Sequence, residues 1–176
     1  MKPHPEQRFE PAPMGRRLWL VFTLVIVVLA LVEVGTLVAA FHGPQRTGPA
    51  WLPFVAVLPA WAIVLGIWWA SQIRGYLLRD GRLVIQRSLR SREYVLAGLE
   101  AVEPLRELPK RILKTWGNDG LGAVSGKFRC KDWGNFEMYL SDPAQPVLLR
   151  WKSGQILVVS PDRAQPFIEA VRRLSH

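Results

Sequence analysis

The sequence predicts a two-helix transmembrane hairpin followed by a mainly-β domain of about seven short strands and one C-terminal α-helix. Three observations lead to this fold class: two long apolar runs, a change to short alternating segments after Ile73, and a last segment with helical spacing of its apolar residues. We therefore divide the chain into a tail (1–17), a helical hairpin (18–73) and a soluble domain (74–176).

The two apolar runs are Leu18–Phe41 and Trp51–Ile73. Each is long enough to cross the hydrocarbon core of a bilayer, which takes ~20 helical residues. The first run contains one formal charge, Glu33, and the second contains none. The preceding tail, residues 1–17, is rich in proline and lacks apolar periodicity, so we expect it to be disordered.

Basic residues flank the hairpin on one side. Arg16 and Arg17 precede the first run and Arg74 follows the second, whereas the connecting segment holds only Arg46. The positive-inside rule then predicts a multi-pass protein with both termini in the cytoplasm. A cleaved export signal is the alternative, but the first run is longer than a signal core and a second run follows at once. The net charge of +9 suits an anionic membrane surface, and we predict no nucleic-acid partner.

The residue pattern of the soluble domain predicts a series of short strands. Asp80–Gly81 stands between two apolar-polar segments, which predicts a tight hairpin. Phe136–Leu140 alternates cleanly, and Val147–Trp151 is expected to pair with Gln155–Ser160. Glu107–Gly126 is rich in glycine and is expected to be irregular.

The last segment is expected to form an amphipathic helix. Phe167, Ile168, Val171 and Leu174 recur at helical spacing, and Asp162 is a suitable N-cap. A helix of this kind must bury its apolar stripe, so we expect it to close the open end of a small sandwich or barrel.

At this point the sequence resembles a known family, the bacterial pleckstrin-homology (PH) domains carried by membrane proteins. The resemblance rests on a glycine-rich entry (Gly120, Gly122, Gly126), the strand FEMYLSD, and VVSPD followed by a helix with a phenylalanine, all within Gly120–Val171. Arg74–Pro104 fits the earlier strands. The resemblance implies a curved seven-strand sheet closed by a C-terminal helix, and a location in the bacterial inner membrane. It carries over no ligand-binding residue.

Four residues are candidates for a lipid-facing surface: Lys110, Arg111, Lys114 and Trp116. Cations and an aromatic ring together suit the headgroup region, where each cation contributes about 1 kcal/mol near an anionic surface. The alternative is a solvated loop. The arginines of the early strands look scattered rather than gathered into a pocket, and Lys127, Arg129 and Lys131 are expected to form a solvated strand face.

The intramembrane candidates are Glu33, Pro59 and Trp61. A carboxylate in hydrocarbon is costly, and Pro59 frees the carbonyl of Val55. We expect a protonated Glu33 to donate a hydrogen bond to the second helix near Val55–Pro59. A contact with another subunit and a snorkelling side chain are the alternatives. The indole N–H of Trp61 would need a partner in lipid.

Catalysis is poorly supported by the sequence. The three histidines are far apart and Cys130 is the one cysteine, so we expect no metal site, no catalytic residue and no cofactor. We therefore predict a non-enzymatic adaptor, with partners among the lipid bilayer, anionic headgroups, an unidentified membrane protein or a second copy of the chain. The alternatives are a small accessory subunit or assembly factor of a membrane complex, and an anionic-lipid receptor.

Overall fold

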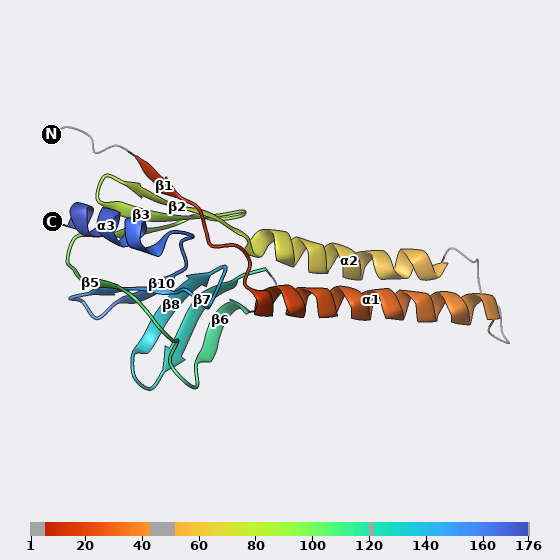
Figure 1. Ribbon diagram of the computed structural model, residues 1–176. Helices are drawn as coiled ribbons and strands as arrows, with labels where there is room; N and C mark the ends of the chain where they lie inside the picture. The colour runs from red at the N-terminus through yellow and green to blue at the C-terminus, as the bar shows by residue number, and fades with distance from the viewer. Residues whose placement is uncertain (1–5, 43–51, 120–121, 176) are drawn as a thin grey trace.

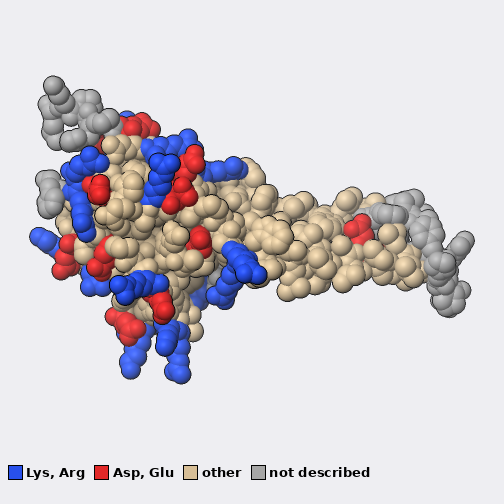
Figure 2. Space-filling view, viewed as in Figure 1, with Lys and Arg blue, Asp and Glu red and all other residues tan. Residues whose placement is uncertain are grey.

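The computed structural model describes residues 6–42, 52–119 and 122–175. Two long helices lie side by side and antiparallel, and a β domain covered by one helix sits at the end where the pair meets the strands (Figure 1). Charged side chains gather over the β domain, while the helix pair is almost entirely uncharged on the face seen in Figure 2.

The helix pair consists of α1 (Arg16–His42) and α2 (Leu52–Ser71), close to the two predicted runs. Among the described residues, Arg16–Ala39 is long and apolar enough to cross a membrane, and Val57–Ser71 is a shorter apolar helix. Large apolar side chains face outward on both helices; Leu24 and Ile63, for example, are 63% and 61% exposed. Two helices are therefore present where two spans were predicted, but only α1 has the length and composition of a span within the described residues, so the two-span hairpin stays a prediction.

The first sheet has four strands in the order β1-β2-β3-β4. They are β1 (Gln7–Phe9), β2 (Ile73–Arg79), β3 (Arg82–Arg87) and β4 (Arg92–Val95). The predicted hairpin between β2 and β3 is confirmed. Asp80 and Gly81 both have positive φ, 48° and 69°, as a two-residue hairpin loop of this type requires.

The expected disorder of residues 1–17 is wrong for the part that the structure describes. β1 pairs with β2 through Arg8 and Leu77, and α1 already begins at Arg16. The ring of Phe9 packs edge-on against Phe167 of the C-terminal helix, at 5.4 Å between centroids. The segment is too short to bury a face alone, but an existing sheet edge supplies both hydrogen bonds and a surface.

The second sheet has six strands in the order β5-β9-β10-β8-β7-β6, in which β8 and β10 are parallel. These strands are β5 (Leu99–Pro104), β6 (Leu113–Asp119), β7 (Val124–Cys130), β8 (Gly134–Leu140), β9 (Val147–Trp151) and β10 (Ile156–Val159). Nine described strands thus follow α2, against about seven predicted. β6 lies in the segment expected to be irregular, and its one glycine, Gly117, stands in a strand rather than in a loop.

The centre of the six-stranded sheet is buried on both faces, and successive residues of a strand point to opposite faces. Leu157 and Val159 face the four-stranded sheet and the C-terminal helix, whereas Ile156 and Val158 face a second cluster with Leu18 of α1. The predicted shared face of β8 is confirmed, since its three apolar residues all lie in that second cluster: Phe136, Met138 and Leu140.

The predicted C-terminal helix is α3 (Ala164–Ser175). Its residues Phe167, Ile168 and Val171 are buried in the first cluster, and Leu174 packs against that cluster. The helix begins two residues after Asp162, whose backbone N–H donates to the carbonyl of Glu10 at 3.0 Å. The last element is therefore tied to the N-terminal segment.

Candidate functional site

The membrane-proximal end of the β domain begins with the segment that leads into α1. This segment is joined to the domain by backbone hydrogen bonds from Ala12 to Ser160 (2.9 Å) and from Gly15 to Ser141 (3.0 Å). Leu18, in the first turn of α1, is only 3% exposed in the second core cluster. α1 is therefore fixed to the domain from its first turn.

The end of α2 is fixed to the domain as well. Strand β2 begins two residues after α2, and the backbone N–H of Ser88 donates to the carbonyl of Gln72 at 3.3 Å. Gly122 lies so close to α2 that a Cβ would stand 2.6 Å from Nε2 of Gln72 and 3.0 Å from the ring of Trp68. The β domain and the helix pair are thus packed together at two separate places.

A polar contact joins the two helices in their outer half. The indole Nε1 of Trp61 donates to Oε2 of Glu33, and the two atoms are 3.3 Å apart. This bond supplies the partner that the sequence demands for Trp61. In this bond an oxygen of Glu33 accepts from a side chain, whereas we expected Glu33 to donate to the backbone near Val55–Pro59. Pro59 lies inside α2 on its exposed side.

The four lipid-facing candidates do not form one surface. Lys110 and Arg111 are exposed in the turn before β6, at the end of that strand farther from α2 by register. Lys114 and Trp116 lie on β6 and line two different clefts. Their lipid-facing role stays a prediction.

Lys114 shares a cleft of about 210 Å³ with Arg17 of α1. The floor of this cleft is apolar and includes Leu18, Phe128 and Met138. Two cations therefore flank an apolar recess at the point where α1 leaves the domain.

Trp116 is 78% exposed and lines a larger cleft of about 410 Å³ between the two sheets, which we name the Arg87 cleft. Three cations line it: Arg87 of β3, Arg92 of β4 and Lys127 of β7. The sequence did not indicate this site, because along the chain the two arginines look scattered and Lys127 falls on a strand face expected to be solvated. Only the pairing of the strands brings the three together. The remaining lining residues are Trp116, Gly117, Ser125, Gly126 and Tyr139.

Two tyrosines next to the Arg87 cleft form hydrogen bonds with the carboxylate of Glu137. The hydroxyls of Tyr94 and Tyr139 both donate to Glu137, the second at 3.4 Å. Burial, and then the hydrogen bond to Glu137, raise the pKa of Tyr94 above its usual range. Both phenols therefore stay protonated, and Glu137 is engaged by neutral donors.

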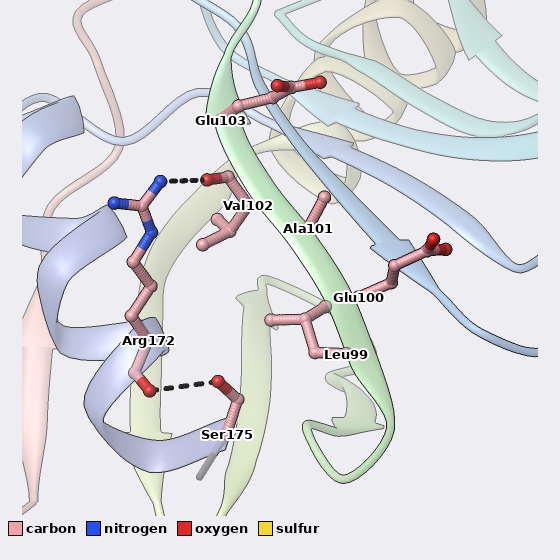
Figure 3. A pocket seen from close by; sticks show the side chains of 7 residues that line it. All are labelled: Leu99, Glu100, Ala101, Val102, Glu103, Arg172 and Ser175. Atoms are coloured by element: carbon pink, nitrogen blue, oxygen red, sulfur yellow. Dashed lines mark hydrogen bonds between the residues drawn. The ribbon is translucent and has the colours of Figure 1, made fainter.

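A third cleft lies between α3 and β5, and its main polar contact serves to pack the helix against the strand. Figure 3 shows Arg172 reaching toward the backbone of β5, where its guanidinium donates to the carbonyl of Val102 at 2.9 Å. Glu100 and Glu103 point away from Arg172 (Figure 3). Within the described ranges, no group of three or more His, Cys, Asp or Glu side chains is placed to hold a metal ion.

The family model for the bacterial PH domain matches residues 74–175, which is more than half of the chain. The chain belongs to the bacterial PH domain family. No curated protein and no solved structure matches it.

The matched region runs from the second residue of β2 to the end of α3, so it contains the Arg87 cleft. β1, α1 and α2 lie outside it, although β1 completes the four-stranded sheet of the PH domain. Two of the segments on which the sequence resemblance rests are joined in the structure: Ser160 of VVSPD accepts a hydrogen bond from the backbone of Ser141 of FEMYLSD, at 2.9 Å. Membership suggests a binding role for the domain.

Proposed function

We propose that this protein is a two-span membrane anchor that presents a cytoplasmic PH domain to a partner protein or to the membrane surface. The observation that supports the proposal is the exposed apolar surface of the helix pair. Its side chains, such as Leu31 and Leu58, are 65% and 61% exposed, and an apolar surface of this length is unfavourable in water. A bilayer removes that surface from water, and the PH domain then stands directly at the headgroups.

The charge distribution supports a cytoplasmic position for the domain. Arg16 and Arg17 begin α1 and Arg74 follows α2, so the cations lie at the same end of the pair as the PH domain. The loop between β3 and β4 lies at that end as well, because Ser88 is bonded to Gln72. In this loop Leu89 is 67% exposed beside the exposed Arg90, a pairing that suits a membrane interface.

The first experiment tests the anchor. We expect the full chain to stay in bacterial membrane vesicles after alkaline carbonate extraction, and a reporter fused after His176 to be active in the cytoplasm. Release of the intact polypeptide by carbonate, or a periplasmic reporter, would contradict the proposal.

The second experiment tests the binding role. A photo-crosslinking residue replaces Trp116 or Leu113, both exposed on β6 but only the first at the Arg87 cleft. We expect capture of a protein or lipid in native membranes from position 116 and not from position 113. Equal capture from both positions would contradict a specific surface.

A further inference from the structure

We propose that Glu33 is the contact point for a transmembrane helix of another protein, and that this partner helix carries a basic residue (Lys, Arg or His) at the depth of Glu33. This inference rests on the proposed function for the bilayer around the helix pair, and it deepens that function by naming the chemistry of a partner. The helix pair is almost entirely uncharged (Figure 2), and Glu33 is the one acidic residue of α1 and α2.

Glu33 lies in the contact between α1 and α2 rather than on their outward faces. Half-buried residues recur along both helices at alternating steps of four and three, the spacing of helices that pack along a common line. We name this line the seam; it contains Phe22, Ile26, Leu29, Glu33 and Thr36 of α1, and Val57, Trp61, Val64 and Trp68 of α2. Two helices leave a seam open at the side, so Glu33 is only half-buried and a third helix can reach it.

One oxygen of the Glu33 carboxylate has a partner among the described residues. Oε2 accepts from the indole of Trp61 at 3.3 Å, whereas the hydroxyl of Thr36 donates at 2.7 Å to the main-chain carbonyl of Glu33. The apolar runs 18–41 and 51–73 contain no Lys, Arg or His. A carboxylate in hydrocarbon is stabilised by a paired cation, and one neutral N–H does not replace that cation. The missing charge must therefore come from outside these two runs.

The position of Glu33 argues against escape of its carboxylate to water. Glu33 lies about 12 Å from the outer end of the first apolar run, at a helical rise of ~1.5 Å per residue. Its bond to Trp61 directs the side chain across to α2 and not along α1 toward the interface. An acidic side chain held at this depth pairs with another group inside the membrane.

Charge complementarity selects the occupant of the open side of the seam. A second copy of this chain would bring another Glu33 and no cation from its apolar runs, so like charges would meet. A helix with a basic residue brings the opposite charge together with the N–H donors that a carboxylate accepts. We therefore infer a partner helix from a different protein, with its basic residue in the outer half of the span.

The first test uses the full chain in bacterial inner membranes together with a probe, a single leucine–alanine span with one lysine at the depth of Glu33. Energy transfer between fluorophores on the two chains measures their association, and the same probe with leucine in place of the lysine gives the baseline. A polar contact between helices in lipid changes association by roughly threefold or more, so we expect the lysine probe to exceed the baseline by at least that factor.

Glu33→Gln separates the charge of Glu33 from its bond to Trp61. A glutamine oxygen still accepts from the indole, so we expect the helix pair to stay intact while the preference for the lysine probe is lost. A preference that persists in Glu33→Gln, or its absence in the wild type, would overturn the inference.

The matched control exchanges two residues, Glu33→Leu with Leu31→Glu, and so keeps the composition of α1. The carboxylate moves by about 3 Å in depth but roughly 200° around the helix, to a position that is 65% exposed. We expect the preference for the lysine probe to fall, because Trp61 no longer orients the carboxylate. An undiminished preference would mean that any carboxylate in the span suffices, and would contradict a site at the seam.

The second test identifies the natural partner. A photo-crosslinking residue replaces Ala30, exposed one helical turn before Glu33, or Leu31 on the opposite side as the control. In native membranes we expect capture from position 30 alone of a protein with Lys, Arg or His in the outer half of a transmembrane segment, and loss of this capture in Glu33→Gln. Capture of a second copy, of a protein without such a residue, or of nothing would overturn the inference.

The carbonate and reporter experiments distinguish this inference from the anchor proposal. A chain that resists carbonate extraction but shows no preference for the lysine probe would refute the inference and leave the anchor intact. Release of the chain by carbonate would refute the anchor and, with it, the inference.

Discussion

At the scale of single residues, Tyr76 connects the two sheets of the PH domain. It is fully buried, its hydroxyl donates to the carbonyl of Tyr139 at 2.9 Å, and it accepts from the backbone N–H of Ser160 at 3.2 Å. Burial raises the pKa of Tyr76 to about 12 from an ordinary value of 10.0. The folded state therefore keeps a proton that the unfolded chain loses above pH 10.

This linkage predicts an alkaline loss of stability. The contribution of Tyr76 is fully present below pH 10 and is lost as the pH rises toward 12, by about 3 kcal/mol in total. Tyr76→Phe loses both hydrogen bonds, so at pH 8 it should unfold about 1–3 kcal/mol more easily. Because phenylalanine does not titrate, the free energies of unfolding of the two proteins should converge between pH 10 and 12. Denaturant unfolding in detergent, followed by near-UV circular dichroism, measures both; a constant difference across this range would contradict the linkage.

The bond between Glu33 and Trp61 is the second prediction at this scale. Polar side-chain bonds between helices in lipid contribute roughly 0.6–2 kcal/mol. Glu33→Leu and Trp61→Phe should each weaken helix association by such an amount, and the double variant should lose no more than either single one. Glu33→Gln keeps an acceptor oxygen and serves as the control. Additive losses in the double-variant cycle, measured by unfolding in detergent, would show that the two side chains act independently.

At the scale of elements, the β6–β7 ladder depends on the pair of glycines at its centre. Gly117→Ala would place a Cβ 2.1 Å from the carbonyl oxygen of Ser125, so the strands must separate. Gly98→Ala is the control, since Gly98 also has positive φ (75°) but nothing lies within 4 Å of its Cβ position. We expect Gly98→Ala to cost about 1 kcal/mol and Gly117→Ala several times more. Equal shifts in the thermal midpoint would mean that backbone strain alone, and not the close approach of the strands, fixes these glycines.

At the scale of the whole molecule, the core of the PH domain is incomplete without the N-terminal segment and the first turn of α1. Phe9 packs on the first core cluster, and Met14 and Leu18 complete the second. A chain of residues 74–176 alone would expose both of these faces, at about 1.5–3 kcal/mol for each large apolar side chain.

We therefore expect the chain 74–176 to aggregate or to melt well below the full-length protein. A second chain, in which residues 6–18 are joined to 72–176 by a Gly/Ser linker, should recover most of the lost stability. Thermal scans with light-scattering detection compare the two. An isolated 74–176 chain as stable as the linked one would show that the N-terminal segment is dispensable.

Several elements were predictable because residues close together in the sequence determine them. The Asp80–Gly81 hairpin, the alternation in β8 and the stripe of α3 each follow from a few neighbouring residues, and the two apolar runs follow from composition alone. By contrast, β1 and β6 form only because a partner strand is already present: a three-residue strand and a glycine-containing strand lack the burial to fold alone.

The sequence alone thus determined the two apolar helices, several of the strands and membership of a β fold closed by a helix, since periodicity and turn chemistry act over a few residues. Tertiary structure decided which distant residues meet. Arg87, Arg92 and Lys127 converge only through the register of strands in two sheets, and Glu33 finds Trp61 only because two helices pack antiparallel. Contacts of this kind depend on the pairing of segments that are far apart in the sequence, and no spacing of residues along the chain predicts that pairing.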